Sequence, residues 1–232
     1  MIVLGVDSSA SCASCALTVD KKTVASFTLD AGNTHSTTLL PMIKACCDRA
    51  GITPAQIDLF ACAVGPGSFT GVRIGVSTVK GLCAPRSAPC VGVSTAAATA
   101  YPLSVCRGTV VPVADARRGN VYTALFSASG GGITRLSEDM IISADELCER
   151  LRELSAPIFF TGDARAVLCE KAAEKGIDAR CAPPVFMSGC AAAVCALAEK
   201  EYESAMDRSV YTAAALTPVY LRPGRVGDAP LQ

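Results

Sequence analysis

The chain has 232 residues, enough for one large domain or two small ones with a real hydrophobic core. Half of the residues are hydrophobic, and 21 Lys and Arg balance 21 Asp and Glu. Strong autonomous binding to nucleic acid phosphates is disfavoured, because it normally requires a basic excess. No apolar run approaches the roughly 18 to 20 residues that cross a bilayer, and the N-terminus lacks the charged start of a signal peptide. We therefore expect a cytoplasmic protein with no membrane partner.

A single histidine, His35, restricts the available chemistry further. Zinc sites with two or three His and HExxH peptidases cannot be built from one imidazole. The 13 cysteines are odd in number and scattered, which favours reduced thiols that serve as small hydrophobic residues. Cys12 and Cys15 form a CxxC pair, but a zinc ribbon needs a second pair. We therefore expect neither a metal site nor a cofactor.

The first half of the chain predicts strands followed by amphipathic helices. The strands are expected at Met1–Val6, Ser14–Val19, Thr23–Leu29 and Leu59–Val64. An apolar stripe then predicts a helix from about Thr34, ended by Gly51 as its C′ residue. The stripe consists of Leu39, Leu40, Ile43, Cys46, Cys47 and Ala50.

A second helix is expected to open at the loop Gly65-Pro66-Gly67-Ser68-Phe69-Thr70-Gly71 and to run to about Cys83. Gly71 and Gly75 lie on one face of this helix, and each interior glycine costs about 1 kcal/mol relative to alanine. Their presence indicates that another backbone comes close to this face. That backbone belongs either to a partner or to the chain's own sheet.

The second half of the chain repeats the pattern of the first. A strand at Thr109–Ala114 ends at Asp115 and is followed by a turn and a strand at Val121–Phe126, just as Met1–Val6 ends at Asp7 before Ser14–Val19. A strand at Ile158–Thr161 and helices at Ser143–Leu154, Ala164–Lys175 and Ser188–Ala205 follow. This duplication predicts an α/β fold with one lobe at residues 1–104 and another at 105–232. The last stretch, Leu216–Arg225, is expected to lie across the lobes.

The glycine-rich loop raises the question of a phosphate site. A P-loop is excluded, because five residues separate Gly65 from Gly71 and Val72 stands where Lys is needed. What remains is either nucleotide contact through the Gly67 and Ser68 amides or a tight structural turn. Asp7 and Asp115 either organise metal and phosphate across a cleft or stabilise their own turns. The candidate nucleotide contacts are Asp7, Ser8, Ser9, Gly67, Ser68 and Asp115.

Several sequence blocks resemble the TsaB (YeaZ) family over nearly the whole chain. They are Leu4-Gly5-Val6-Asp7-Ser8-Ser9, His35-Ser36, the run from Gly65 to Gly75, Asp115-Ala116-Arg117-Arg118 and Pro218-Val219-Tyr220-Leu221-Arg222. The resemblance implies the two-lobed fold of actin, Hsp70 and sugar kinases (ASKHA), with duplicated ribonuclease-H-like lobes. It also implies a non-catalytic scaffold subunit for making threonylcarbamoyladenosine in tRNA. Such a subunit pairs with the TsaD transferase, recruits the TsaE ATPase and meets tRNA only through the complex.

In the family, the first two helices mediate homodimerisation of the isolated subunit and, alternatively, pairing with TsaD. The resemblance therefore implies an interface made of His35, Ser36, Leu39, Leu40, Ile43, Gly71, Arg73, Ile74, Gly75 and Thr78. A Gly75→Leu variant is then expected to fold and to lose association with TsaD. TsaD holds its metal through an HxxxH motif, which a chain with one histidine cannot carry. We therefore expect no catalytic residue.

Other functions remain open on the sequence. One is an ATPase or small-molecule kinase that uses Asp7 and Asp115 across the cleft between the lobes. Another is a peptidase, which the shortage of histidines disfavours.

Overall fold

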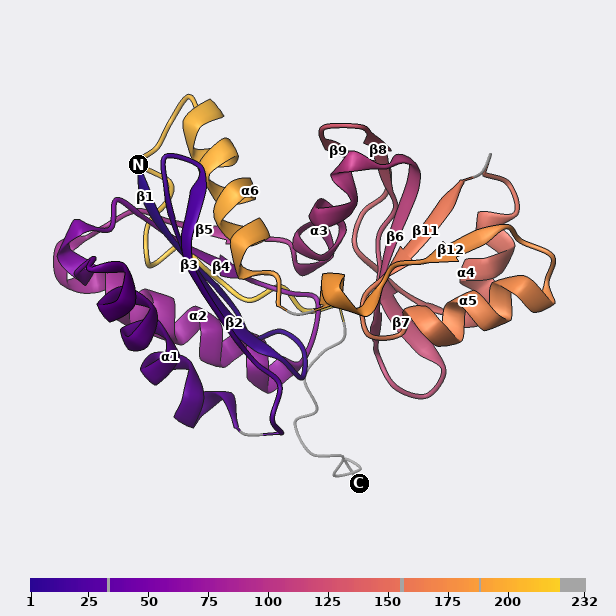
Figure 1. Cartoon of the computed structure of the whole chain (residues 1–232), viewed down its shortest axis with the longest axis horizontal. Coiled ribbons are helices and arrows are strands. Elements are labelled where there is room, and N and C mark those ends of the chain that lie inside the picture. The colour runs from indigo at the N-terminus through magenta and orange to yellow at the C-terminus, as the bar shows by residue number, and fades with distance from the viewer. Residues whose placement is uncertain (33, 155–156, 188, 222–232) are drawn as a thin grey trace, which may run out of the picture.

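The computed structural model describes residues 1–32, 34–154, 157–187 and 189–221. In these ranges the strands form two sheets, and each sheet lies in its own lobe with helices packed against it (Figure 1). The two α/β lobes expected from the duplicated pattern are therefore present. None of the helices described is long and apolar enough to cross a membrane.

The first sheet has the strand order β3-β2-β1-β4-β5. Its strands are β1 (Ile2–Asp7), β2 (Ala13–Val19), β3 (Lys22–Leu29), β4 (Leu59–Ala63) and β5 (Cys90–Val93). The β1–β2 and β2–β3 pairs are antiparallel, whereas β1–β4 and β4–β5 are parallel. Every residue of β4 is buried, as expected for a parallel strand covered on both faces.

The second sheet repeats this order as β10-β7-β6-β11-β12. Its strands are β6 (Arg107–Asp115), β7 (Asn120–Thr123), β10 (Met140–Ser143), β11 (Ile158–Thr161) and β12 (Ala179–Cys181), with β8 (Phe126–Ser129) and β9 (Ile133–Arg135) joined at the start of β6. In the first sheet, β1 pairs antiparallel with β2 and parallel with β4. In the second sheet, β6 pairs in the same way, antiparallel with β7 and parallel with β11. The internal repeat predicted from the hairpins thus extends to whole sheets.

Two helices cover one face of the first sheet, α1 (His35–Ala50) and α2 (Phe69–Cys83). The inward stripe of α1 consists of Leu39, Ile43, Cys46 and Cys47. Gly51 ends α1 in the left-handed conformation, with φ of 65°, as its position after the stripe predicted. On the second sheet, α4 (Ala144–Leu151) and α5 (Arg165–Glu174) pack in the same way.

The other face of the first sheet is covered by α6 (Ala191–Ser204). Gly5 on β1 makes this possible, because a Cβ there would lie 2.5 Å from the Ala191 carbonyl oxygen. The expected second lobe, residues 105–232, includes α6. In the structure, however, the buried side of α6 packs on β1, β2 and β4 of the first sheet. Helix α3 (Thr95–Ala100) packs against β6 and so joins the lobes.

The C-terminal segment is described as far as Leu221, so the remainder of the expected crossing, residues 222–225, lies outside the described residues. Leu216 is buried in the core that α1 and α2 form with the first sheet. The Val219 amide donates a hydrogen bond to the Val64 carbonyl at 2.7 Å. The described part of this segment therefore lies along the first lobe.

The expected strand Val121–Phe126 was wrong in its extent. The chain forms β7, leaves the sheet at Ala124 and Leu125, and returns as β8 to pair with the opposite half of β6. Both halves are apolar and β-favouring, so composition alone could not reveal the break. The short elements η1 (Pro54–Gln56), η2 (Ala84–Arg86), η3 (Tyr101–Val105) and η4 (Pro184–Met187) complete the described elements.

Candidate functional site between the lobes

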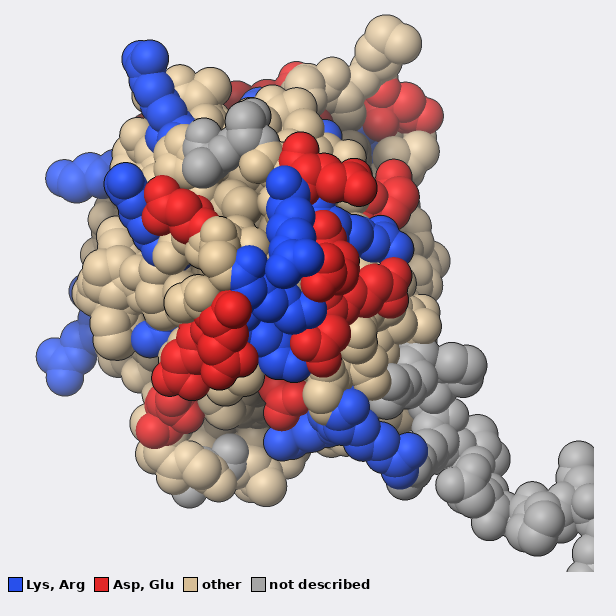
Figure 2. Space-filling model, turned by 90° about the vertical axis from the view of Figure 1, so that its right-hand side faces the viewer, with Lys and Arg blue, Asp and Glu red and all other residues tan. Residues whose placement is uncertain are grey.

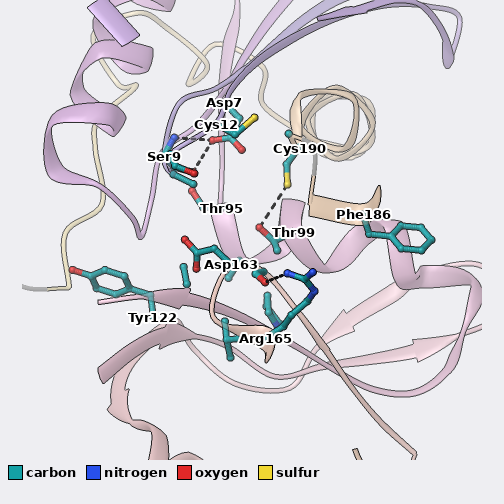
Figure 3. A pocket seen from close by; sticks show the side chains of 18 of the residues that line it. Asp7, Ser9, Cys12, Thr95, Thr99, Tyr122, Asp163, Arg165, Phe186 and Cys190 are labelled. Atoms are coloured by element: carbon teal, nitrogen blue, oxygen red, sulfur yellow. Dashed lines mark hydrogen bonds between the residues drawn. The ribbon is translucent and has the colours of Figure 1, made fainter. Parts of the chain in front are cut away.

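A cleft of about 440 Å³ lies where the two sheets face each other. Its walls come from the end of β1 and the loop after it, from β6, from the end of β11 and from the N-terminal ends of α3 and α6 (Figure 3). Carboxyl ends of parallel strands are where α/β folds place their ligand sites. The polar lining includes Asp7, Ser9, Thr95, Thr99, Tyr122, Asp163 and Arg165.

Asp7 is the last residue of β1 and is only 5% exposed. Its Oδ1 accepts hydrogen bonds from the Ser9 amide at 2.9 Å and from the Ser9 hydroxyl at 2.6 Å. Burial raises the pKa of the Asp7 carboxyl, although the Ser9 hydrogen bonds oppose that rise. Asp7 therefore orders its own turn, and its side chain also lines the cleft.

Asp163 is the carboxylate that faces Asp7 from the second lobe (Figure 3). It follows β11, and its Oδ1 accepts a hydrogen bond from the Asp115 amide at 2.9 Å. Burial raises the pKa of the Asp163 carboxyl. The sequence signal for Asp163 is the Gly162-Asp163 pair directly after an apolar strand.

Asp115, expected to stand opposite Asp7, does not line the cleft. Its carboxylate accepts a hydrogen bond from the Arg117 amide at 2.7 Å and pairs with the Arg117 guanidinium at 3.1 Å. Its side chain is about half exposed. The turn-stabilising interpretation is the correct one for Asp115.

The glycine-rich loop packs against the loop after β1, and its Ser68 amide is bonded there. The Ser68 amide donates to the Ser9 carbonyl at 2.7 Å, and the Ser68 hydroxyl caps α2 by accepting from the Gly71 amide at 3.2 Å. A Cβ on Gly67 would lie 2.4 Å from the Ser9 carbonyl oxygen. Ser8 is buried and its hydroxyl donates to the Gly71 carbonyl at 2.8 Å. Of the candidate nucleotide contacts, the structure brings only Asp7 and Ser9 to the cleft among the residues described.

The charges of the cleft are mainly negative. Asp7, Asp30 and Asp163 line it, whereas its described cation, Arg165, donates to the carbonyls of Ala182 at 2.9 Å and Gly162 at 3.3 Å. In the described ranges, no group of three or more His, Cys, Asp or Glu side chains is placed to hold a metal ion. A polyphosphate would meet carboxylates without a matching set of donors.

Two thiols also line the cleft, Cys12 and Cys190. Burial raises the pKa of Cys12 to about 11 and that of Cys190 to about 12. Both thiols are therefore protonated at neutral pH, which makes them poor nucleophiles and poor metal ligands. Cys12 and Cys190 are both buried, as expected for cysteines that serve as small hydrophobic residues.

Four residues expected at a partner interface belong instead to the chain's own core. Leu39 and Ile43 are 1% and 3% exposed. A Cβ on Gly71 would lie 2.1 Å from the Ser8 carbonyl oxygen, and one on Gly75 would lie 2.6 Å from the Ser8 hydroxyl. Ser8, in the chain's own loop after β1, approaches Gly71 with its backbone carbonyl and Gly75 with its side chain. A leucine at position 75 would therefore be forced into the core.

The outer side of α1 and α2 carries the remaining residues of that set. Ser36, Leu40 and Arg73 are exposed, while His35, Ile74 and Thr78 are half-buried. The His35 ring also bonds inward, with Nε2 at 2.8 Å from the Ala10 carbonyl oxygen.

Two aromatic residues on this side of α2 were not predicted from the sequence to be part of the interface. Phe69 and Tyr220 are 39% and 40% exposed, with ring centroids 4.8 Å apart. The Arg73 guanidinium lies 4.4 Å from the Phe69 centroid. The signal for Phe69 was its place directly after the Ser68 cap, where a side chain points out of the first helical turn.

Comparison with solved structures defines the class of protein. YeaZ from Pseudomonas aeruginosa superposes with a TM-score of 0.74 at 22% identity, over 95% of this chain and 99% of that one. A ROK hexokinase from Thermus thermophilus superposes with a TM-score of 0.52 at 11% identity, over 88% of this chain and all of that one. The chain therefore has the two-lobed ASKHA fold, as its sequence predicted.

Sequence comparison identifies the family. Residues 29–220 match the family model described as TsaD, tRNA N6-adenosine threonylcarbamoyltransferase. The tRNA threonylcarbamoyladenosine biosynthesis protein TsaB of Bacillus subtilis is 30% identical over 70% of this chain and 71% of its own length. The Escherichia coli protein of the same name is 33% identical over 67% of this chain and 68% of its own length. The chain belongs to the TsaB family of tRNA threonylcarbamoyladenosine biosynthesis proteins.

The packing of α2 against the β1 loop predicts opposite effects for two glycines on the same helix. Gly71→Ala should lower the free energy of unfolding by about 3 kcal/mol, because its Cβ overlaps a backbone oxygen. Gly81→Ala should raise it by up to about 1 kcal/mol, because no atom lies within 4 Å of its Cβ and alanine favours the helix. Urea unfolding measures both. A Gly71→Ala protein as stable as the wild type would contradict this packing.

The burial of Asp7 predicts a dependence of stability on pH. Because its folded-state pKa is raised, its contribution to stability is complete below the unfolded pKa and is lost as pH rises through the folded pKa. The free energy of unfolding of the wild type, relative to Asp7→Asn, should therefore fall as pH increases over that window. Urea unfolding across a pH series measures this difference.

Asp207 supplies the matched control. Its Oδ1 accepts the same two hydrogen bonds, from the Ser209 amide at 2.9 Å and the Ser209 hydroxyl at 2.7 Å, but the residue is exposed. These bonds lower the pKa of Asp207. Relative to Asp207→Asn, the wild type should gain stability as pH rises. Slopes of the same sign for the two variants would contradict the role of burial at Asp7.

Proposed function

We propose that the chain is a non-catalytic scaffold subunit of the assembly that makes threonylcarbamoyladenosine in tRNA, working in the cytoplasm. In this proposal it pairs with a TsaD-like transferase and so holds the transferase in its active form. Family membership supports the pathway. The exposed aromatic and apolar face of α1, α2 and the C-terminal segment is the observation that carries the pairing.

That face, defined here by Leu40, Phe69, Arg73 and Tyr220, has the composition of a binding surface. Leu40 is 54% exposed, and the two rings contact each other without being buried. Aromatic and Arg side chains are enriched among the residues that dominate binding energy at interfaces. The helices that carry the face are themselves anchored in the core by the inward residues Leu39, Ile43 and Gly71. A rigid support of this kind lowers the conformational cost of binding.

The same face would serve a homodimer when the isolated chain has no other partner. A surface with exposed rings is better covered than left in water, and a second copy offers the same apolar groups. Pairing with the transferase then competes with self-association. In this proposal, a TsaE-like ATPase binds the pair that the chain forms with the transferase.

Contact with tRNA is proposed to occur only through the complex. Figure 2 shows the outer face of the second lobe, where acidic and basic side chains are interspersed. Lys171 and Lys175 there pair with Asp145 at 2.8 and 3.4 Å, and Arg152 pairs with Glu149 at 2.9 Å. Cations engaged with carboxylates are poorly disposed to bind phosphates, and the whole chain has no net charge.

The alternative, an ATPase or kinase, has one observation in its favour. Asp7, at the end of β1, and Asp163, just after β11, line the cleft from opposite lobes. Against it, the Ser68 amide is already bonded and Arg165 already donates to carbonyl oxygens. Tight binding of ATP and magnesium by the isolated chain, abolished in Asp7→Asn, would favour this alternative over the scaffold.

The test of the scaffold proposal uses one substitution on each lobe. Leu40→Glu should weaken binding to the TsaD-like transferase from the same source by about 2 kcal/mol, roughly thirtyfold, because a charge enters an apolar contact. Val167→Glu is the control, since Val167 is 60% exposed on α5 of the other lobe. Titration calorimetry measures both affinities. Formation of threonylcarbamoyladenosine by the reconstituted enzymes should fall with Leu40→Glu and persist with Val167→Glu.

Two outcomes would defeat the proposal. The first is modification of tRNA that proceeds undiminished when this chain is omitted. The second is an affinity for the transferase that Leu40→Glu and Val167→Glu leave equally intact.

A further inference from the structure

A second hollow lies along α6, outside the cleft between the lobes. It is bounded by one side of α6 from Ala192 to Glu203, the β2–β3 hairpin and η3, and has a volume of about 550 Å³. Small-molecule sites in proteins typically occupy about 300 to 1,000 Å³. This groove and the cleft share none of their lining residues. The residues lining the groove are Thr18, Lys21, Thr23, Tyr101, Pro102, Ala192, Ala193, Ala196, Glu199, Lys200 and Glu203.

Glu199 is the residue in the groove that requires explanation. It is 3% exposed, and its Oε2 has no hydrogen-bond partner among the described residues. Thr18, which also lines the groove, is equally buried. Unpaired buried polar groups are costly, and a buried carboxylate is the most costly of them. A ligand group that donates hydrogen bonds would relieve this cost.

The other charges near Glu199 are largely paired within the chain. Lys21 pairs with Glu203 at 2.9 Å, and the N-terminal ammonium pairs with Asp20. The charges of both pairs act on Glu199. Burial and the neighbouring Glu203 charge raise the pKa of the Glu199 carboxyl. Lys200, at the exposed rim, makes no ion pair within the described ranges. The groove therefore retains one carboxylate inside and one ammonium at its edge.

The rest of the lining on α6 and on η3 is largely apolar. Ala192, Ala193 and Ala196 form the helix side, and the pair Tyr101-Pro102 stands at η3. We propose that this groove binds a small zwitterion of the amino acid class, with its ammonium on Glu199 and its carboxylate toward Lys200. A polyanion would meet Glu199 and Glu203, and a polyamine would meet Lys21 and Lys200. One charge of each sign matches what the groove leaves unpaired.

The test uses the full chain labelled with ¹⁵N and the standard amino acids, titrated one at a time. At least one amino acid should produce saturable amide shifts around Thr18 and Glu199, with a dissociation constant of about 1 mM or tighter. Glu199→Gln should weaken that binding at least tenfold, because the ammonium loses its counter-charge. Glu201→Gln is the matched control, since it lies on the same helix and does not line the groove.

Lys200→Met keeps the inference testable even if Glu199→Gln does not fold, because Lys200 is exposed. It should weaken the same amino acid several-fold and leave propylamine, which has no carboxylate, unaffected. Absence of saturable shifts with every amino acid would overturn the inference. So would equal binding by the wild type, Glu199→Gln and Lys200→Met.

Discussion

The end of β1 is held between two helices that approach its backbone closely. On one side, a Cβ at Gly71 of α2 would come within 2.1 Å of the Ser8 carbonyl oxygen. On the other, a Cβ at Gly5 would come within 2.5 Å of the Ala191 carbonyl oxygen on α6. Glycine allows contacts at this distance because it has no side chain to displace. The position of Asp7 at the cleft and the orientation of α2 both follow from this packing.

The same packing separates the inner and outer functions of α1 and α2. Their inner sides are committed to the core of the first lobe, through Leu39, Ile43 and the α2 glycines. Their outer sides keep Leu40, Phe69 and Arg73 exposed, with Tyr220 brought beside Phe69 by the C-terminal segment. A partner can therefore dock on these helices without rearranging the lobe that supports them. The cleft between the lobes retains the architecture of the fold but offers carboxylates and protonated thiols.

Much of the fold could be predicted from local patterns. Asp7 and Asp115 marked the matching strand ends, and Gly51 and Ser143 marked a helix end and a helix start. These features are set by residues close in sequence, so the sequence is sufficient to find them. The break between β7 and β8 is different, because it depends on which half of β6 each segment pairs with.

The candidate site was harder to predict for the same reason. Asp163 replaces Asp115 in the cleft because β11 lies beside β6, and that pairing joins residues far apart in the chain. Gly71 correctly indicated a close backbone approach, whereas Gly75 is approached by the Ser8 and Cys62 side chains. The sequence could not show which segment of the chain would lie there. The groove at Glu199 requires α6 to return to the first sheet, which the expected lobe boundary did not include.

We propose that the outer face of α1 and α2 docks the transferase while the cleft remains free. Amide hydrogen exchange of this chain, alone and with the TsaD-like transferase, tests it most directly. Added protection should appear in residues 35–50, 69–83 and 217–221, with little change in α4 and α5. Protection confined to the second lobe, or to the walls of the cleft, would contradict the account.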